Sequence, residues 1–345
     1  MTDLTEQEAA ALVALQRGIA LTERPFAELG AACGLDEAAV LALIRRLHAS
    51  GEARRFGAVF DGHRLGYRSA LCSMTVSNAR LPEIAGIVSA DSGVTHAYER
   101  GWPAELPRDL PGGPGDQSWP NLWFTLSAPA DAFAAKLQAL RVACQPYGIH
   151  ELPASRRFKI DVVFDVRTRE RDEQVATSRL PLAKEPEPLP ALDETEREIV
   201  RLLQGDVPVC ERFFQSAAER LGMTESDLLG RLRVWQTSGV LRRIGLLLRH
   251  RVIGFKANGM CCWDIPEEEV VETGRRVAAC PEVTHCYARP RLDVFPFRLY
   301  AMIHTQEWSA TQQLFERISR EAGLTGGQVL LSVREFKKTS MEFFS

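Results

Sequence analysis

The feature that most restricts the possible folds of this chain is a long pattern that occurs twice. SGVTHAYER at 92–100 returns as PEVTHCYAR at 281–289. Three more pairs of segments match in the same order: 50–70 with 238–258, 121–128 with 298–305, and 154–161 with 332–339. Because the copies are long and keep their internal order, the chain is a tandem duplication of whole domains and not a solenoid of short repeats.

Each copy begins with a pattern typical of a helix-turn-helix unit. Apolar residues at helical spacing predict three short helices in the first copy, over 5–18, 25–34 and 35–51. Asp36 can cap the third of these, and the second copy repeats that helix over 223–239. The segment ARRFGAVFD at 53–61 follows, and we expect it to form a small hairpin like a wing.

After these helices the spacing of apolar residues changes to that of strands. YRSALCSMTV, VTHAYER, NLWFTLSA and RRFKIDVVFDV predict strands, whereas RLPEIAGIVSA and ADAFAAKLQALRVAC predict helices. The resulting order βαββαβ is that of a ferredoxin-like domain. Its two helices cover one face of the sheet, so the other face needs a second sheet or a ligand.

The predicted fold class is therefore α+β, a tandem duplication of helix-turn-helix plus ferredoxin-like domains. A charged and then proline-rich stretch separates the copies and reads as an exposed linker. The expected segments are 1–60 (helix-turn-helix with wing), 61–166 (ferredoxin-like), 167–192 (linker), 193–248 (second helix-turn-helix) and 249–345 (second ferredoxin-like).

Composition and charge exclude several classes of protein. The formal net charge of −3 gives no basic excess of the kind that nucleic-acid binders usually carry. No apolar run is long enough to span a membrane, and the N-terminus is acidic where a signal peptide is basic. The eight cysteines form no Cys-x-x-Cys pair, so we expect reduced thiols and a cytoplasmic protein.

The order of domains resembles the Lrp/AsnC family of bacterial regulators. The wording of the motifs resembles one offshoot of that family, the sirohaem decarboxylases, in their fused NirD–NirL form. The phrases that carry this resemblance are RRFGAVFDGHRLGYRS, VTHAYER, NLWFTL and LPASRRFKIDVVFD in the first copy, and RRIGLLLRHRVIGFKAN, VTHCYAR, RLYAMIH and REFKKTSMEFF in the second. They cover nearly all of both copies.

This resemblance implies a carboxy-lyase that needs no cofactor, because its iron arrives with the substrate. It would remove carbon dioxide from the C12 and C18 acetate groups of sirohaem and give 12,18-didecarboxysirohaem for haem d1 biosynthesis in denitrification. The two copies would act as a pseudo-dimer that holds the tetrapyrrole between them. Which copy builds the working site is left open, because the first has a longer loop at 101–120 and Arg251 replaces His63 in the second.

The repeated phrase itself suggests how such a site is built. Residues two apart in a strand share a face, so His96, Tyr98 and Arg100 should form a row, as should His285, Tyr287 and Arg289. Histidine suits a proton donor near neutral pH, and arginine suits carboxylates. The candidate catalytic residues are His96, His285, Tyr98 and Tyr287. The candidate substrate-binding residues are Arg54, Arg55, Arg100, Arg242, Arg243, Arg289, Arg298, Trp123 and Tyr300.

No metal-ligand spacing is present, and no residue is assigned as an axial ligand to the iron. The expected partners are sirohaem or a related iron tetrapyrrole, a second copy of the chain and enzymes of the tetrapyrrole pathway, without DNA or membrane. Two alternatives stay open: an Lrp/AsnC-type transcriptional regulator and a tetrapyrrole sensor without catalysis. Asp36, Glu37, Glu225 and Asp227 argue against the regulator, because they would meet phosphates at the start of the recognition helices.

Overall fold

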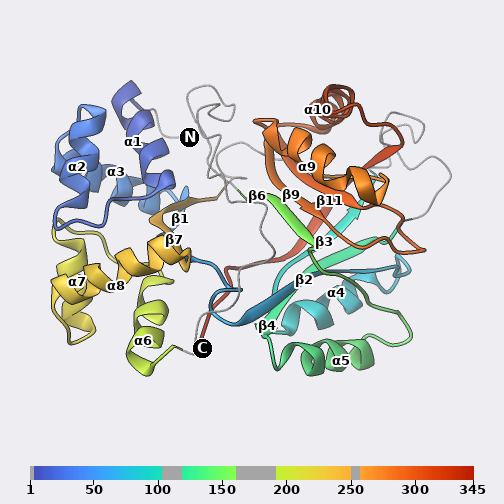
Figure 1. The fold of residues 1–345 in the computed structure, drawn as a ribbon, viewed down its shortest axis with the longest axis horizontal. Coiled ribbons are helices and arrows are strands. Elements are labelled where there is room, and N and C mark those ends of the chain that lie inside the picture. The colour runs from blue at the N-terminus through green and yellow to red at the C-terminus, as the bar shows by residue number, and fades with distance from the viewer. Residues whose placement is uncertain (1–3, 103–118, 161–191, 250–256) are drawn as a thin grey trace.

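The computed structural model describes residues 4–102, 119–160, 192–249 and 257–345, which form two lobes (Figure 1). One lobe holds the helices of both helix-turn-helix units, and the other holds both ferredoxin-like units. Nearly all of the predicted linker and most of the long loop of the first copy lie outside the described residues.

The helix-turn-helix lobe is made of six helices and two strands among the described residues. They are α1 (Glu6–Arg17), α2 (Pro25–Cys33), α3 (Glu37–Ala49) and β1 (Ala53–Phe60) of the first repeat, and α6 (Glu194–Leu203), α7 (Phe213–Arg220), α8 (Glu225–Ser238) and β7 (Leu241–Leu248) of the second. The predicted cap Asp36 accepts a hydrogen bond from the amide of Ala39 at 2.7 Å. Phe213 packs edge to face on both Phe26 and Phe56, so both repeats share one core.

The segment expected to form a wing hairpin is instead a single strand. β1 pairs antiparallel with β7 of the other repeat, and Gly57 lies opposite Gly245. These glycines are also equivalent in the repeat, so the pseudo-twofold axis passes between them. The prediction differs because the apolar residues Phe56 and Phe60 need burial on one face and a partner strand beside them, and the second repeat supplies both.

The second lobe contains two βαββαβ units. The first unit consists of β2 (Tyr67–Met74), α4 (Leu81–Ala90), β3 (Val94–Gly101), β4 (Leu122–Pro129), α5 (Phe133–Ala143) and β5 (His150–Leu152). The second consists of β8 (Ala257–Trp263), α9 (Val270–Ala279), β9 (Val283–Ala288), β10 (Leu299–Thr305), α10 (Trp308–Glu321) and β11 (Gly327–Lys338). Both have the ferredoxin-like strand order, β5-β2-β4-β3 and β11-β8-β10-β9, which confirms the predicted fold class.

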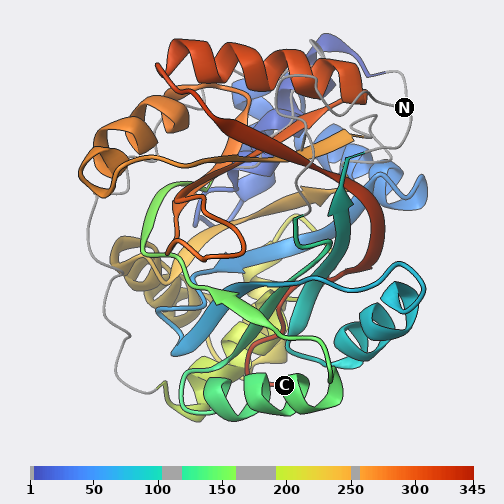
Figure 2. The same cartoon turned by 90° about the vertical axis from the view of Figure 1, so that its right-hand side faces the viewer.

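The two half-sheets face each other, and the helices cover their outer faces (Figure 2). The inner faces enclose a third cluster that includes Trp123, Phe295, Phe297 and Tyr300. The sequence analysis expected either a second sheet or a ligand on the face that the helices leave open. The structure shows that a second sheet covers this face.

The last strand of each repeat crosses to the other repeat. β11 pairs with β8 of its own unit through Leu331 and then continues along β3 of the first unit. The predicted last strand of the first repeat, 156–166, is described as far as β6 (Arg156–Ile160), which pairs with β9 of the second repeat. The strand that pairs with β2 in its own unit is the preceding β5, which the sequence analysis did not predict. The described strands of this lobe thus form one continuous sheet of nine strands.

The chain that follows β11 returns to the helix-turn-helix lobe beside α6, where the C-terminus lies in Figure 1. Gln204 and Phe343 exchange two hydrogen bonds, of 2.7 and 3.0 Å. The ring of Phe343 packs edge to face on Tyr67, with ring centres 5.0 Å apart. These contacts help to fix one lobe against the other.

Strands β1 and β7 form a two-stranded ribbon, and backbone from the end of α6 approaches its centre closely at Gly57. This close approach predicts a large difference in stability between two glycine-to-alanine variants. A Cβ atom at Gly57 would lie 2.3 Å from the carbonyl oxygen of Gly205, whereas a Cβ at Gly86 in α4 meets nothing within 4 Å. We expect Gly57→Ala to lower the free energy of unfolding by about 1–3 kcal/mol, because backbone must move. Gly86→Ala should raise it by up to about 1 kcal/mol. Urea unfolding measures both, and equal effects would contradict the described ribbon.

Candidate functional site

The repeated phrase of the first repeat forms a continuous row on the inner face of its sheet. Ala97 packs on the helix-covered side, so His96, Tyr98 and Arg100 point to the other side. The ring centres of His96 and Tyr98 are 6.3 Å apart, and the guanidinium carbon of Arg100 lies 5.2 Å from the centre of the Tyr98 ring. The structure therefore brings these three predicted residues together.

The second repeat has the same row. His285 and Tyr287 have ring centres 6.2 Å apart, and the guanidinium carbon of Arg289 lies 5.0 Å from the Tyr287 ring. Arg289 also donates a hydrogen bond to the carbonyl of Leu152. Burial raises the pKa of Tyr287, so its phenol stays protonated at neutral pH.

The threonine that precedes each histidine orients the imidazole ring. Nδ1 of His285 lies 3.0 Å from the hydroxyl of Thr284, and Nδ1 of His96 lies 2.9 Å from that of Thr95. The hydroxyl of Thr284 donates its one hydrogen to the carbonyl of Met302 at 3.0 Å, so it accepts from His285. Nδ1 of His285 is therefore the donor in this contact. This explains the Thr-His pair in both phrases, which the sequence analysis did not interpret.

The two rows meet closely enough for their charges to interact. Burial lowers the pKa of His96 to about 3, and Lys338, Arg54, His285 and Arg100 lower it further. His96 is therefore neutral near pH 7 in the free protein. A proton donor at this position needs a negative charge beside it, which a ligand with carboxylates would supply.

Arg100 carries a buried charge that has no counter-ion among the residues that the structure describes. It is only 6% exposed, and its Nη1 has no hydrogen-bond partner within the described parts of the chain. Its Nη2 reaches the sulfur of Met302 at 4.0 Å, across the interior. Burial lowers its pKa to about 10, so it stays charged at neutral pH. An uncompensated guanidinium of this kind favours an anionic ligand.

Lys338 lies beside the first row, and the sequence analysis missed it. β11 places Lys338 opposite His96, while the neighbouring Lys337 turns to the outer side and donates to the carbonyls of Ser89 and Asp91. Burial lowers the pKa of Lys338 to about 8, and Arg54 adds to this effect. The sequence signal that could have identified Lys338 is the alignment of the repeats, because a lysine in the second copy stands where the first copy has the apolar Ile160.

The ribbon brings Arg54 and Arg242 to the two rows. Arg54 is close enough to Tyr98 and Glu335 for their charges to interact, and burial lowers its pKa. Arg242 donates to Asp61 at 2.7 Å, and the same carboxylate oxygen lies 3.5 Å from Arg157. Burial would raise the pKa of Asp61, but Arg242 and Arg157 outweigh it and hold that pKa below its ordinary value.

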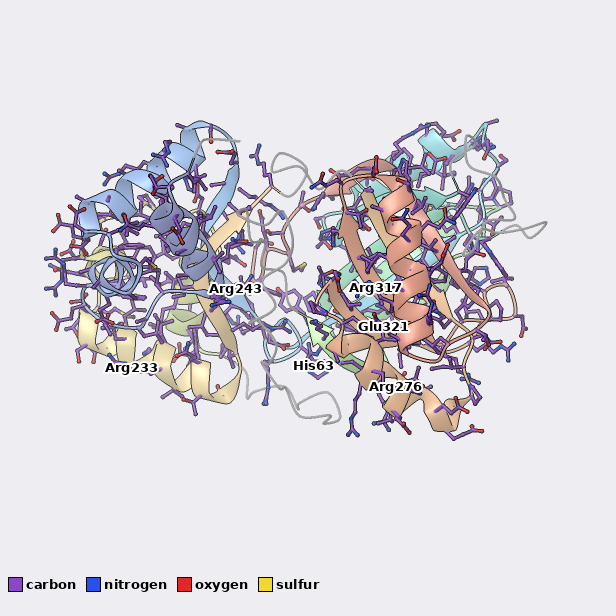
Figure 3. The ribbon with its side chains drawn as sticks, turned by 90° about the horizontal axis from the view of Figure 1, so that it is seen from above. His63, Arg233, Arg243, Arg276, Arg317 and Glu321 are labelled. Carbon is purple, nitrogen blue, oxygen red and sulfur yellow. The ribbon has the colours of Figure 1, made fainter. Side chains whose placement is uncertain are left out.

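Arg55 and Arg243 lie in the helix-turn-helix lobe, which differs from the predicted role in binding carboxylates. Arg55 donates to the carbonyls of Ala58 at 3.1 Å and Gly205 at 3.5 Å, just beyond the end of α6. Arg243 lies against Gly18, just beyond the end of α1 (Figure 3). Arg55 thus contacts the helix-turn-helix lobe, whereas Arg54 lies near Tyr98 and Glu335, so the two arginines do not share one site.

The remaining candidates have structural partners. Trp123 and Tyr300 are at most 3% exposed in the inner cluster, where Trp123 donates to the carbonyl of Pro120 at 2.6 Å and Tyr300 to that of Phe297 at 3.2 Å. Arg298 lies 3.6 Å from Glu267 near the surface. The binding roles of these three residues stay predictions.

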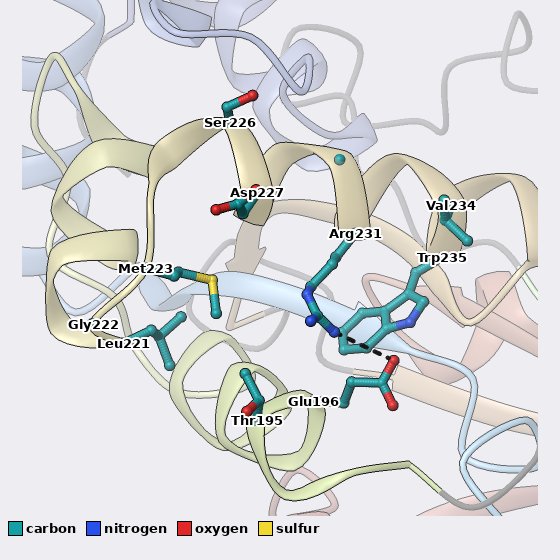
Figure 4. Close-up of a pocket in the computed structure, with 11 residues that line it drawn as sticks. Thr195, Glu196, Leu221, Gly222, Met223, Ser226, Asp227, Arg231, Val234 and Trp235 are labelled. Atoms are coloured by element: carbon teal, nitrogen blue, oxygen red, sulfur yellow. Dashed lines mark ion pairs between the residues drawn. The ribbon is translucent and has the colours of Figure 1, made fainter.

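The described part of the helix-turn-helix lobe contains a separate hollow of about 610 Å³ between α6 and α8 (Figure 4). An ion pair between Arg231 and Glu196, 3.8 Å apart, crosses it, and Met223 and Trp235 line it. No histidine lines this hollow, and it is distinct from the two rows.

Several charged groups of the helices that would read DNA in a regulator are engaged within the chain. Arg46 in α3 pairs with Glu8 at 2.7 Å, and Arg233 in α8 donates to the carbonyl of Leu21 at 2.7 Å. The acidic residues at the starts of these helices are also paired, Glu37 with Arg24 and Glu225 with Arg212. This surface would lose internal contacts on binding phosphates.

The eight cysteines are all free thiols, as expected. Within the described ranges, no group of three or more histidine, cysteine or acidic side chains is arranged to hold a metal ion. Among the helices of those ranges, none combines the length and apolar character needed to cross a membrane.

Two family models match this chain, and each matches it twice. The model described as "Siroheme decarboxylase NirDL-like HTH domain" matches residues 8–54 and 196–242. The model described as "AsnC-like ligand binding domain" matches residues 64–159 and 252–337. The duplication inferred from the sequence is therefore found by both models.

Relatives match over nearly the whole chain. "Siroheme decarboxylase" of Hydrogenobacter thermophilus is 36% identical over 96% of this chain and 93% of its own. "Siroheme decarboxylase NirDL subunit" of Paracoccus denitrificans is 30% identical over 94% and 93%. The crystal structure of the siroheme decarboxylase NirDL has a TM-score of 0.71 and 31% identity, covering 98% of this chain and 94% of its own. Its complex with an iron-uroporphyrin III analogue has a TM-score of 0.70.

The low pKa of His96 predicts how stability depends on pH. Between pH 6.5 and about 3 the unfolded imidazole is protonated and the folded one is neutral, so unfolding takes up a proton. The free energy of unfolding should fall as pH falls through this window. His96→Gln should reduce that slope by up to about 1.4 kcal/mol per pH unit. Urea unfolding from pH 7.5 to 4.5 tests this, with the values above pH 7 as the baseline, and parallel curves would contradict it.

Proposed function

The chain belongs to the sirohaem decarboxylase family of carboxy-lyases, in its NirDL form, and from this premise we propose that it removes carbon dioxide from the C12 and C18 acetate groups of sirohaem. The product would be 12,18-didecarboxysirohaem, for haem d1 biosynthesis. The observation that carries this proposal is the pair of His-Tyr-Arg rows on the inner faces, where Arg100 keeps a buried charge without a counter-ion among the described residues.

The proposed chemistry needs a place for an electron pair and a source for a proton. The bond between the methylene carbon and the carboxylate breaks, carbon dioxide leaves, and the electron pair stays on the methylene carbon, where the macrocycle can delocalise it. An imidazolium then gives its proton to that carbon, so the acetate becomes a methyl group. Each decarboxylation thus consumes one proton, two for each molecule of sirohaem, and no oxidant or reductant is required. We expect no cofactor beyond the iron that the substrate carries.

His96 and His285 are the proposed proton donors. His96 is neutral in the free protein because of burial and of the surrounding cations. A bound carboxylate would oppose those cations and raise the pKa of His96, so the donor would be charged only when substrate is present. Tyr98 and Tyr287 lie between the histidine and the arginine of each row and would support the flat macrocycle.

We expect activity in the cytoplasm, as a homo-oligomer or together with enzymes of the tetrapyrrole pathway. The hypothesis of a DNA-binding regulator loses support from the internal pairing of Arg46, Glu37 and Glu225. A tetrapyrrole sensor would share the binding groups but would not release carbon dioxide.

The proposed donors can be tested by substitution. Purified protein should consume sirohaem under anaerobic conditions and release carbon dioxide. His96→Ala or His285→Ala should lower the rate by at least about tenfold, because proton transfer to the carbanion is lost, while binding of the macrocycle is kept. The measurements are product formation by chromatography and binding by absorbance.

The outcomes separate the alternatives. If both variants turn over at the wild-type rate, the assignment of the donors is wrong. If the wild-type protein binds sirohaem tightly and never converts it, the protein is a sensor.

The absence of DNA binding is tested by a gel shift at low salt, where phosphate contacts are strongest. We expect no retention of duplex DNA at micromolar protein, because Arg46 and Arg233 in the helices that would read DNA are engaged within the chain. Retention that decreases as salt is added would support the regulator.

A further inference from the structure

One pair of equivalent positions in the two repeats carries opposite charges. Asp61 follows β1, and the residue at the same position after β7 is Arg249. Because β1 and β7 run antiparallel, each of these residues lies near the ribbon arginine of the other repeat, Asp61 near Arg242 and Arg249 near Arg54. The same fold therefore creates two pseudo-equivalent positions with different electrostatics.

The position at Asp61 is closed by internal contacts. One carboxylate oxygen accepts from the backbone amide of His63 at 3.0 Å and lies 3.4 Å from that of Arg64. The other accepts from Arg242 at 2.7 Å and lies 3.5 Å from Arg157. Arg242 and Arg157 are therefore already paired, so a ligand carboxylate that approached them would have to compete with a buried aspartate.

At the position of Arg249, by contrast, positive charges lie together without an aspartate between them. Arg249 and Arg54 repel each other, and Arg54 makes no ion pair with any carboxylate in the described part of the chain, although Glu335 lies within electrostatic range. Lys338 stands opposite His96 on the same side, and Arg100 lies behind Tyr98 with its buried Nη1 unpartnered in the described residues. Three cations, Arg54, Lys338 and Arg100, thus lie close enough to His96 to lower its pKa, and Arg249 adds a fourth positive charge beside Arg54.

Like charges held together cost free energy unless an anion separates them. The chain keeps this arrangement on one side and neutralises the equivalent side with an aspartate. A polycarboxylate that binds at the first side would relieve the repulsion and would place its acid groups beside His96. The tetrapyrrole of the proposed function has this chemistry, because several carboxylates surround its ring.

We propose that the carboxylates of the substrate are anchored on one side only, by Arg54, Arg249, Lys338 and Arg100, and that Asp61 closes the equivalent side. This inference rests on the proposed function for the identity of the polycarboxylate. The duplicated fold then holds its ligand in one orientation, with the anchored edge beside His96. Lys338, Arg249 and Asp61 become residues that determine the orientation.

The test compares charge changes on the two sides. Arg249 is exposed, so Arg249→Gln and Arg249→Glu should not disturb folding, and Arg249→Lys keeps the charge. Lys338→Gln is the second change on the anchoring side. Arg157→Gln is the matched control, because it removes one cation from the closed side. Affinity is measured by anaerobic absorbance titration with iron-uroporphyrin III, turnover is measured with sirohaem, and thermal unfolding verifies folding.

We expect Kd to rise about tenfold for Arg249→Gln and for Lys338→Gln, and further for Arg249→Glu, as one charge contact is lost or reversed. Arg249→Lys and Arg157→Gln should stay within about twofold of the wild-type protein. The dependence of Kd on salt should weaken in Arg249→Gln and stay unchanged in Arg157→Gln.

Failure of this inference differs from failure of the proposed function. If Arg157→Gln weakens binding as much as Arg249→Gln does, or if neither anchoring variant weakens it, one-sided anchoring is wrong even when sirohaem is converted. If the wild-type protein releases no carbon dioxide, the proposed reaction is wrong, and the titration with iron-uroporphyrin III still decides between the two sides.

Discussion

Two sheet edges, those of β3 and β9, control how this chain can fold. In each βαββαβ unit the second strand lies at an edge, with backbone groups that no strand of its own unit pairs. The last strand of the other repeat closes each edge, β11 on β3 and β6 on β9. This exchange turns the two inner faces toward each other. The His-Tyr-Arg rows lie on these edge strands, so the same exchange brings both rows into one interior.

The pseudo-twofold frame makes positions equivalent without making residues equal. Gly57 and Gly245 mark the axis, and both are required because the C-terminal ends of α6 and α1 approach them. Away from the axis the repeats diverge where charge matters, at Asp61 and Arg249. A duplicated backbone can therefore present two surfaces of similar shape and different potential, which allows an asymmetric ligand to bind in one orientation.

The helix-turn-helix units of the two repeats form one lobe. Their apolar faces merge into one core, and ion pairs between the repeats, Arg24 with Glu211 and Arg212 with Glu23, hold them together. The contribution of this lobe to the candidate site is the ribbon that follows the helices, because it carries Arg54 and Arg242 to the rows.

The sequence by itself determined the duplication, the order of elements and the face that His96, Tyr98 and Arg100 share, because helical and strand periodicities are local properties of the chain. It could not determine that β1 pairs with β7, that Lys338 stands opposite His96 or that Asp61 neutralises Arg242. Each of these contacts joins residues more than 180 positions apart, and only the crossing of the two repeats brings them together. The charges around each histidine were therefore decided by the tertiary structure.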